Sequence, residues 1–275
     1  MFLKLGPRQS EFPAAVLIPN MLTTLALCSG LAAIHYALKP DWDRALAAVF
    51  LAGIFDALDG RAARLLRVTS GFGAILDSLS DFLSFGVAPA IILHQWLAGQ
   101  DQLVGRSGLL SLAAFMTYAL GAAIRLARFT SEPHPPKPAK GGVESVAPFF
   151  RGMPSPAAAG IALVPLFLAN SRYWPDAWDL PGWAVVLNAF LIGVLMVTRV
   201  PMYSLKALRV TRRAVAPLLV GVGLLAAAML KDPLLTIAGL GIVYAVSVPI
   251  TAVLWWRVGR AAVATPETPA ERTPT

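Results

Sequence analysis

Four aspartates, Asp56, Asp59, Asp77 and Asp81, are the residues of this chain whose type and spacing are best suited to chemistry. On helices, the first two residues (i, i+3) share one face and the last two (i, i+4) share another. A tight turn around Ser70 would bring the two faces together. The spacing therefore predicts a cluster of four carboxylates between two helices.

Both pairs of aspartates border strongly apolar runs, at 47–55 and 87–93. One acidic residue at the centre of a membrane helix costs roughly 2.5–3.5 kcal/mol, so four would cost about 10 kcal/mol before their mutual repulsion. Clustered carboxylates stay ionised only if a cation or shared protons compensate them. Hard cations such as Mg²⁺ and Mn²⁺ take oxygen ligands, so we expect a divalent metal site here.

The composition of the 275-residue chain identifies the setting of this site, because 57% of the residues are hydrophobic and only 14% are charged. A soluble domain would carry roughly 25% charged residues. We therefore expect an all-α, polytopic membrane protein. A net charge of +8 could suggest a nucleic-acid partner, but in a membrane protein the placement of the basic residues matters more than their sum, and we expect no nucleic-acid partner.

Eight apolar stretches are of about the length that spans a bilayer. These candidate spans are residues 14–37, 45–66, 74–98, 108–129, 155–170, 182–200, 214–230 and 233–256. We expect residues 1–260 to form a single domain. Residues 261–275, rich in Pro, Thr and Glu, are expected to be a disordered tail.

The basic residues predict the orientation of these spans. With a cytoplasmic N-terminus, few basic residues face the opposite side, namely Lys39, Arg44, Arg106, Arg172 and Lys231. The positive-inside rule then places both termini and the aspartates on the cytoplasmic side. We expect a protein of the cytoplasmic (inner) membrane.

The aspartates and the small residues between them resemble the signature of the CDP-alcohol phosphatidyltransferases. Here it reads Asp56-x-x-Asp59-Gly60-x-x-Ala63-Arg64, eight residues, then Gly73-x-x-x-Asp77-x-x-x-Asp81. Further segments are similar to the phosphatidylserine synthase branch of that family, namely 18–23, 77–90, 125–129 and 152–159. The match runs from about residue 18 to residue 206, and Thr130 departs from the Asn of many relatives.

The resemblance implies transfer of the phosphatidyl group of CDP-diacylglycerol to the hydroxyl of L-serine, with release of CMP. It implies that the four aspartates surround Mg²⁺ or Mn²⁺, with two ions expected. It also implies that Asp81 is the general base, with Asp77 as the second choice. A homodimer that interacts with membrane lipids matches the habit of the family.

The resemblance also implies substrate-binding residues. Gly60, Ala63 and Gly73 would let the cytidine lie against helix backbone, although small residues in membrane helices also serve close packing. Arg64 would face a phosphate. Asn20 and Thr23, one turn apart in the first span, fit either a nucleotide contact or a hydrogen bond between helices.

Arg125 and Arg128 end the fourth span. An arginine can hold the carboxylate of serine with two hydrogen bonds. Phosphate binding and simple anchoring at the membrane surface are alternatives for both.

Two alternatives to serine transfer follow from the same residues. The acceptor could be another alcohol, such as glycerol 3-phosphate or inositol phosphate. In a different class, carboxylates within a membrane can mark a cation transporter. A transporter would spread them along a path, whereas these gather beside Arg and Gly.

Overall fold

The computed structural model describes residues 14–68, 70–99, 106–131, 149–151, 153–175, 180–198, 201–203 and 215–263. Almost all regular structure in these ranges is helical, as the composition predicts. The first five elements are α1 (Ala14–Ala37), α2 (Trp42–Leu66), α3 (Gly71–Asp81), the π-helical turn η1 (Phe82–Val87) and α4 (Ala88–Gly99). Next come α5 (Arg106–Ser131), β1 (Phe149–Arg151), α6 (Ser155–Ala162), α7 (Val164–Ala169) and α8 (Gly182–Val197). The last are β2 (Pro201–Tyr203), α9 (Val215–Lys231) and α10 (Pro233–Val263).

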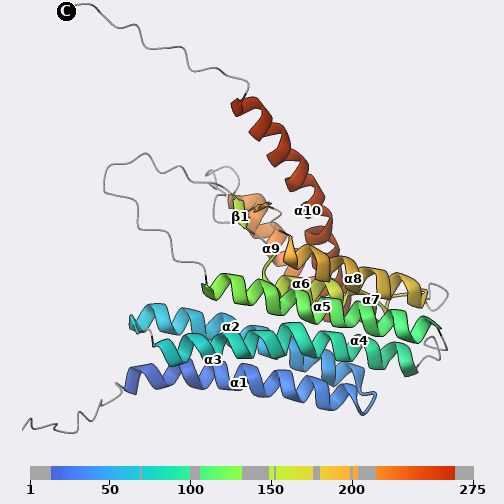
Figure 1. Ribbon diagram of the computed structural model, residues 1–275, viewed down its shortest axis with the longest axis horizontal. Helices are drawn as coiled ribbons and strands as arrows, with labels where there is room; N and C mark the ends of the chain where they lie inside the picture. Colours follow the sequence, from blue (N-terminus) through green and yellow to red (C-terminus); the bar gives the residue numbers. More distant parts are fainter. Residues whose placement is uncertain are drawn as a thin grey trace, which may run out of the picture.

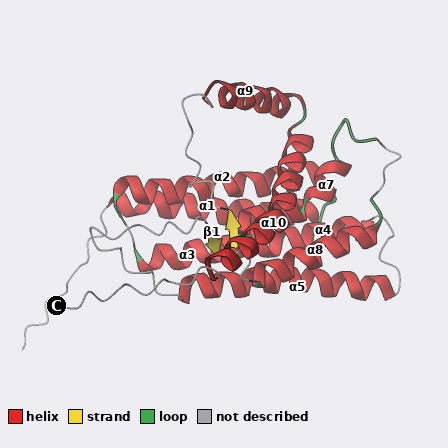
Figure 2. Ribbon diagram, turned by 90° about the horizontal axis from the view of Figure 1, so that it is seen from above, coloured by secondary structure: helices red, strands yellow, loops and turns green. Residues whose placement is uncertain are grey.

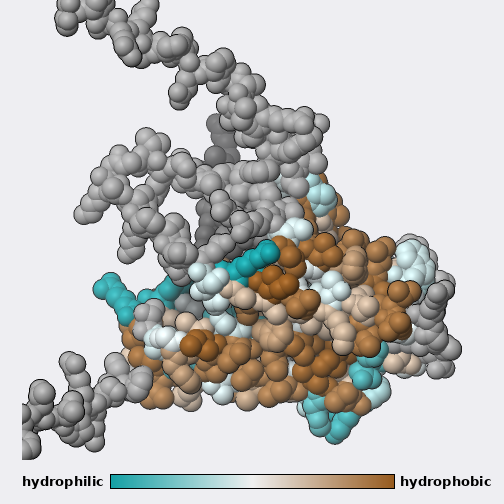
Figure 3. Space-filling view, viewed as in Figure 1, coloured by the Kyte–Doolittle hydropathy of each residue, from teal (hydrophilic) through white to brown (hydrophobic). Residues whose placement is uncertain are grey.

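Four stretches of helix are long and apolar enough to cross a membrane, and they make this an integral membrane protein. They are Ala15–Ala37, Gly71–Gly99, Gly108–Ser131 and Pro233–Thr251. Gly182–Val197 and Ala216–Lys231 are shorter apolar helices. Hydrophobic residues accordingly cover most of the bundle face seen in Figure 3.

Two of the expected spans have an internal structure that the sequence analysis did not predict. The span expected at 74–98 consists of α3, η1 and α4 in one continuous helical stretch. The span expected at 155–170 is interrupted at Leu163, between α6 and α7. Pro165 stands in the first turn of α7, where its missing N–H does no harm, whereas inside a longer helix it would break a hydrogen bond.

A small β-sheet is the other departure from the expected all-α fold. Strands β1 and β2 pair antiparallel, with Phe149 opposite Tyr203 and Arg151 opposite Pro201. The helices still determine the architecture. The segment 132–148 after α5, which contains four prolines between 133 and 138, and the expected C-terminal tail beyond Val263 lie outside the described residues.

The helices α1 to α5 and α8 run roughly along the long axis of the bundle, and α10 runs at a steep angle to them and extends away from the bundle (Figure 1). α1 packs against both α2 and α3, and α5 packs against α8. Gly193 permits the second contact, because a Cβ there would lie 2.7 Å from the Cα of Tyr118. α9 lies at the edge of the molecule (Figure 2), and most of its residues from Ala216 onward are exposed.

A short turn between α2 and α3 sets the geometry of the site. Arg67 takes a left-handed backbone conformation (φ 52°), and its N–H donates to the carbonyls of Ala63 and Arg64, which ends α2. Ser70 begins α3, because its hydroxyl accepts the N–H of Gly73 at 2.9 Å. The tight turn expected around Ser70 is therefore confirmed.

Candidate active site

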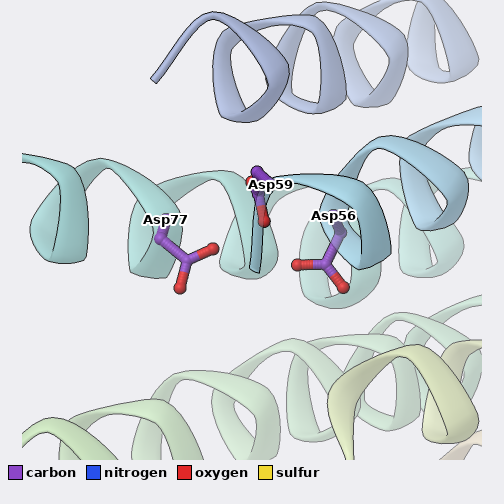
Figure 4. A group of neighbouring side chains, drawn as sticks. All are labelled: Asp56, Asp59 and Asp77. Carbon is purple, nitrogen blue, oxygen red and sulfur yellow. The ribbon is translucent and has the colours of Figure 1, made fainter. Parts of the chain in front are cut away.

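Three of the four aspartates meet between α2 and α3. One carboxylate oxygen of each of Asp56, Asp59 and Asp77 lies within 4.8 Å of the others. Figure 4 shows the three side chains converging, two from α2 and one from α3. The i, i+3 spacing on α2 and the turn before α3 produce this arrangement, as the sequence predicts.

The surroundings of the cluster favour a bound cation. Asp59 is buried, with 5% of its surface exposed, and Asp56 and Asp77 are half-buried. Three carboxylates this close repel one another strongly unless positive charge is supplied. The donor set consists of oxygen atoms alone, which suits Mg²⁺ or Mn²⁺ and fits zinc poorly. The cluster could therefore bind a divalent metal ion.

Thr23 of α1 holds the buried aspartate. Its hydroxyl lies 2.6 Å from Oδ2 of Asp59 and 3.1 Å from the carbonyl oxygen of Pro19. Thr23 is itself buried, with 4% exposed. Of the two roles expected for this residue, the structure realises the hydrogen bond between helices.

Asp81 stands one helical turn beyond Asp77, beside the group of three. Its carboxyl lies within hydrogen-bonding reach of Asp56, and the charges of Asp77 and Arg125 act on it. The fourth aspartate is thus adjacent to the cluster while facing a basic side chain from α5. A group in this position can exchange a proton with a ligand of the cluster.

A cavity of about 170 Å³ opens beside the carboxylates. Its lining contains Asp59 and Asp77 together with five of the six residues expected to bind the CDP-lipid, namely Asn20, Thr23, Gly60, Ala63 and Gly73. The sixth, Arg64, has an exposed side chain and lies outside this lining. The structure thus brings most of the expected residues to one hollow.

The two glycines of this cavity have different surroundings. A Cβ on Gly73 would come within 2.8 Å of Oδ1 of Asn20 and 2.9 Å of Oγ of Ser70, so a larger residue there would force these two side chains to shift. A Cβ on Gly60 would meet no atom within 4 Å. Gly73 therefore allows close packing, while Gly60 leaves space next to the carboxylates.

The two arginines at the end of α5 point to different places. Arg125 is half-buried, donates a hydrogen bond to the hydroxyl of Ser155, and interacts electrostatically with Asp81, while Tyr244 of α10 lies nearby. Arg128 is exposed and donates to the carbonyl oxygen of Val197, at the end of α8, at 2.7 Å. Only Arg125 faces the aspartates.

Three features around the site were not predicted from the sequence. Ser155, with 1% exposed, lies in a segment that the sequence singles out, but nothing indicated its contact with Arg125. Tyr244 comes from the last described helix and reaches Arg125 through tertiary packing alone. The π-helical turn that follows Asp81 has no compositional signal, although such turns often lie at functional sites.

The π-helical turn is fastened on two sides. The hydroxyl of Tyr118, a fully buried residue of α5, donates to the carbonyl oxygen of Phe85 at 2.7 Å. Ser84 donates to the carbonyl oxygen of Ala26 at 3.2 Å, and Ser80 to that of Thr23 at 3.3 Å. These contacts fix the rotation of α3, and with it the direction of its two aspartates.

Residues 16–253 match the family model described as CDP-alcohol phosphatidyltransferase. The chain belongs to this family.

Several curated relatives are similar to this chain over most of its length. A protein of Mycobacterium tuberculosis (strain H37Rv) is 32% identical over 239 residues, which is 85% of this chain and 77% of the relative. One from Mycobacterium leprae is 30% identical over 248 residues (88% and 77%), and one from Helicobacter pylori strain 26695 is 34% identical over 191 residues (67% and 70%). All three are named CDP-diacylglycerol–serine O-phosphatidyltransferase.

Proposed function

We propose that this protein transfers the phosphatidyl group of CDP-diacylglycerol to L-serine, giving phosphatidylserine and CMP. The observation that carries the proposal is the group of three carboxylates beside a hollow lined by small residues. The names of the relatives supply the acceptor.

Asp56, Asp59 and Asp77 would hold the metal ions, Mg²⁺ or Mn²⁺, and we propose two ions with Asp81 completing the set. When bound, the ions neutralise the charge of the diphosphate and stabilise the departing CMP. The protein itself holds these ligands in place through Thr23 and through the turn between α2 and α3.

Asp81 is the proposed general base, with Asp77 as second choice. The serine hydroxyl oxygen attacks the phosphorus that carries the lipid, a P–O bond to this phosphorus forms, and the P–O bond to CMP breaks. The hydroxyl proton passes to the Asp81 carboxylate. The position of Asp81, beside the cluster and facing Arg125, supports this assignment.

The hollow beside the carboxylates is the proposed site of the nucleotide. Asn20, Gly60, Ala63 and Gly73 would contact the CDP moiety, while Thr23 acts through Asp59. Arg64 lies one helical turn beyond Gly60 on α2, and we propose that its side chain reaches a phosphate only once the substrate is bound.

Arg125 is the proposed partner of the serine carboxylate. Its guanidinium is held by Ser155 and faces Asp81, so serine bound there would place its hydroxyl near the base. The guanidinium of Arg128 donates a hydrogen bond to the carbonyl oxygen of Val197. Arg128 would therefore support serine binding indirectly, through the packing of α5 on α8.

For the wider arrangement we keep the predictions from the sequence as proposals. We propose eight membrane spans, the site on the cytoplasmic side of the inner membrane, a single domain over residues 1–260 and a homodimer. The gathering of basic residues in the loops on one side supports the orientation.

An acceptor comparison tests the proposed reaction. Purified protein is given CDP-diacylglycerol, a divalent ion and one of L-serine, glycerol 3-phosphate or inositol phosphate, and the lipid product is identified by mass spectrometry. We expect phosphatidylserine alone, and loss of product in Asp81→Asn by about 10²-fold or more. A product from another alcohol would move the protein to a different branch of its family. No product with any acceptor, from protein that also fails to bind CDP-lipid, would overturn the proposal.

A further inference from the structure

A second, larger cavity lies far from the aspartate cluster. It has a volume of about 540 Å³ and is bordered by the start of α2, the end of α7, and the junction of α9 with α10. On α2, Asp43 in its lining precedes Asp56 of the cluster by 13 residues, or about 20 Å of helix. The proposed orientation puts the cluster on the cytoplasmic side, and this separation along α2 then places the cavity at the opposite leaflet.

The wall of this cavity is mostly apolar. It includes Leu46 and Phe50 of α2, Met229 and Leu230 of α9, and Ile237 of α10. It adjoins α9, whose exposed side chains such as Leu224 (67%) are apolar. A volume of several hundred Å³ with an apolar wall is typical of sites for small organic ligands and lipid chains.

Two basic side chains stand at the mouth of the cavity. Arg172 and Lys231 line it, are both exposed, and form no ion pair with any other residue that the structure describes. The Lys231 ammonium lies 4.8 Å from the centre of the Tyr173 ring, which holds it at this position. Of the two acidic groups in the lining, Asp43 is exposed and Asp232 is buried.

The buried carboxylate of Asp232 fixes the arrangement. It accepts hydrogen bonds from the hydroxyl of Ser171 at 2.7 Å, the N–H of Arg172 at 3.2 Å and the N–H of Leu235 at 3.0 Å. These hydrogen bonds stabilise the negative charge of Asp232 and connect the segment that carries Arg172 to the start of α10. The fold therefore fixes the positions of Arg172 and Lys231 at the mouth of the cavity. The Asp232 carboxylate is satisfied by these hydrogen bonds and pairs with neither of the two basic side chains.

We propose that this cavity binds a glycerophospholipid of the leaflet opposite the catalytic site, with the lipid phosphate between Arg172 and Lys231 and an acyl chain along α2 and α9. Arginine and lysine bind phosphate through charge-assisted hydrogen bonds. Basic pockets between membrane helices bind lipid head groups in this way. The lipid would also cover the exposed apolar face of α9. The proposal does not depend on the proposed reaction, but its choice of leaflet rests on the proposed orientation.

Lipid binding to the purified protein in detergent tests the proposal. The probes are phosphatidylglycerol, diacylglycerol, which lacks the phosphate, and inorganic phosphate, which lacks the chains. Binding is followed by native mass spectrometry and by the midpoint of thermal unfolding. We expect only phosphatidylglycerol to bind and to raise the midpoint. The affinity for phosphatidylglycerol should fall by about 10-fold or more in the double variant Arg172→Gln/Lys231→Gln. The single variant Lys231→Arg, which keeps both positive charges, should bind like the unmodified protein.

Two control variants separate this site from the others. Lys39→Gln removes an exposed basic residue at the same end of the bundle that does not line the cavity. Asp77→Asn alters the catalytic cluster. Both should bind phosphatidylglycerol like the unmodified protein. The proposal is overturned if the double variant binds as well as Lys39→Gln, if Asp77→Asn removes the binding, or if diacylglycerol or inorganic phosphate stabilises the protein equally.

Discussion

At the scale of single residues, the site depends on side chains that act through others. The buried hydroxyl of Thr23 holds Asp59 at the proposed metal site, and the buried hydroxyl of Ser155 holds Arg125 at the proposed serine site. Such supporting hydrogen bonds tune affinity without touching the ligand. Each can be removed by a change of one hydroxyl group.

Thr23→Val removes the hydroxyl that donates to Asp59 and preserves the shape of the side chain. The concentration of Mn²⁺ that gives half-maximal activity should rise about 10-fold or more, as is usual when a supporting contact of a metal ligand is lost. The activity at saturating Mn²⁺ should fall less. Thr24→Val is a matched control, because the hydroxyl of Thr24 is exposed and bonds only to its own helix. An equal shift in the control would contradict this role for Thr23.

Ser155→Ala leaves the guanidinium of Arg125 without its buried partner. A hydrogen bond to a charged group contributes roughly 1.5–3 kcal/mol, so the KM for serine should rise about 10-fold or more. The KM for CDP-diacylglycerol should stay unchanged, and Ser155→Thr should restore most of the serine affinity. A parallel loss of affinity for both substrates would indicate a merely structural role.

At the scale of elements, the sequence predicted the helices better than their interruptions. The long apolar runs that became α1, α5 and α10 could be recognised because length and composition suffice. The aspartate cluster could be recognised because helical spacing places Asp56 beside Asp59. The π-helical turn depends instead on the Tyr118 hydroxyl, which comes from a helix that follows later in the chain. Tyr244 likewise reaches the site only by packing, so neither was visible in a local pattern.

The junction of α9 and α10 makes stability depend on pH through Asp232. Burial alone would raise the pKa of its carboxyl, but the hydrogen bonds from Leu235, Ser171 and Arg172 outweigh burial and lower the pKa below its usual value. A carboxyl whose pKa is lowered on folding stabilises the native state above its unfolded pKa of about 3.9. This stabilisation is lost as the pH falls through the native pKa.

Asp232→Asn should therefore lower the midpoint of thermal unfolding near neutral pH, and the difference from the unmodified protein should shrink as the pH falls below about 4. Differential scanning fluorimetry in detergent measures both. Asp41→Asn serves as control, because Asp41 pairs with the exposed Arg44, and such surface pairs contribute little. A difference that stays constant down to low pH would show that the charge of Asp232 is not what stabilises the junction.

At the scale of the whole molecule, the two ends of the bundle are chemically distinct. The aspartate cluster lies toward one end, and the turn between α1 and α2 lies at the other, near the second cavity. The proposed orientation puts the first end in the cytoplasm, where the nucleotide substrate is available. This placement can be tested directly because the chain has a single cysteine.

Replacing Cys28 by Ser gives a background for labelling single introduced cysteines. In intact cells, Lys39→Cys in the turn after α1 should react with a thiol reagent that does not cross the membrane, whereas Arg67→Cys in the turn after α2 should react only after the cells are opened. Both positions are exposed, so exposure does not bias the comparison. The opposite pattern would reverse the proposed orientation and move the catalytic cluster to the outer face.

The central claim is that the carboxylates of α2 and α3 hold the metal ions on which phosphatidyl transfer depends. The most direct measurement is the release of CMP from CDP-diacylglycerol and L-serine, titrated with Mn²⁺, in the unmodified protein and in Asp77→Asn. We expect no release without a divalent ion, and a loss of about 10²-fold or more in the variant at every Mn²⁺ concentration. Metal-independent release, or an unaltered titration in a folded Asp77→Asn protein, would contradict it.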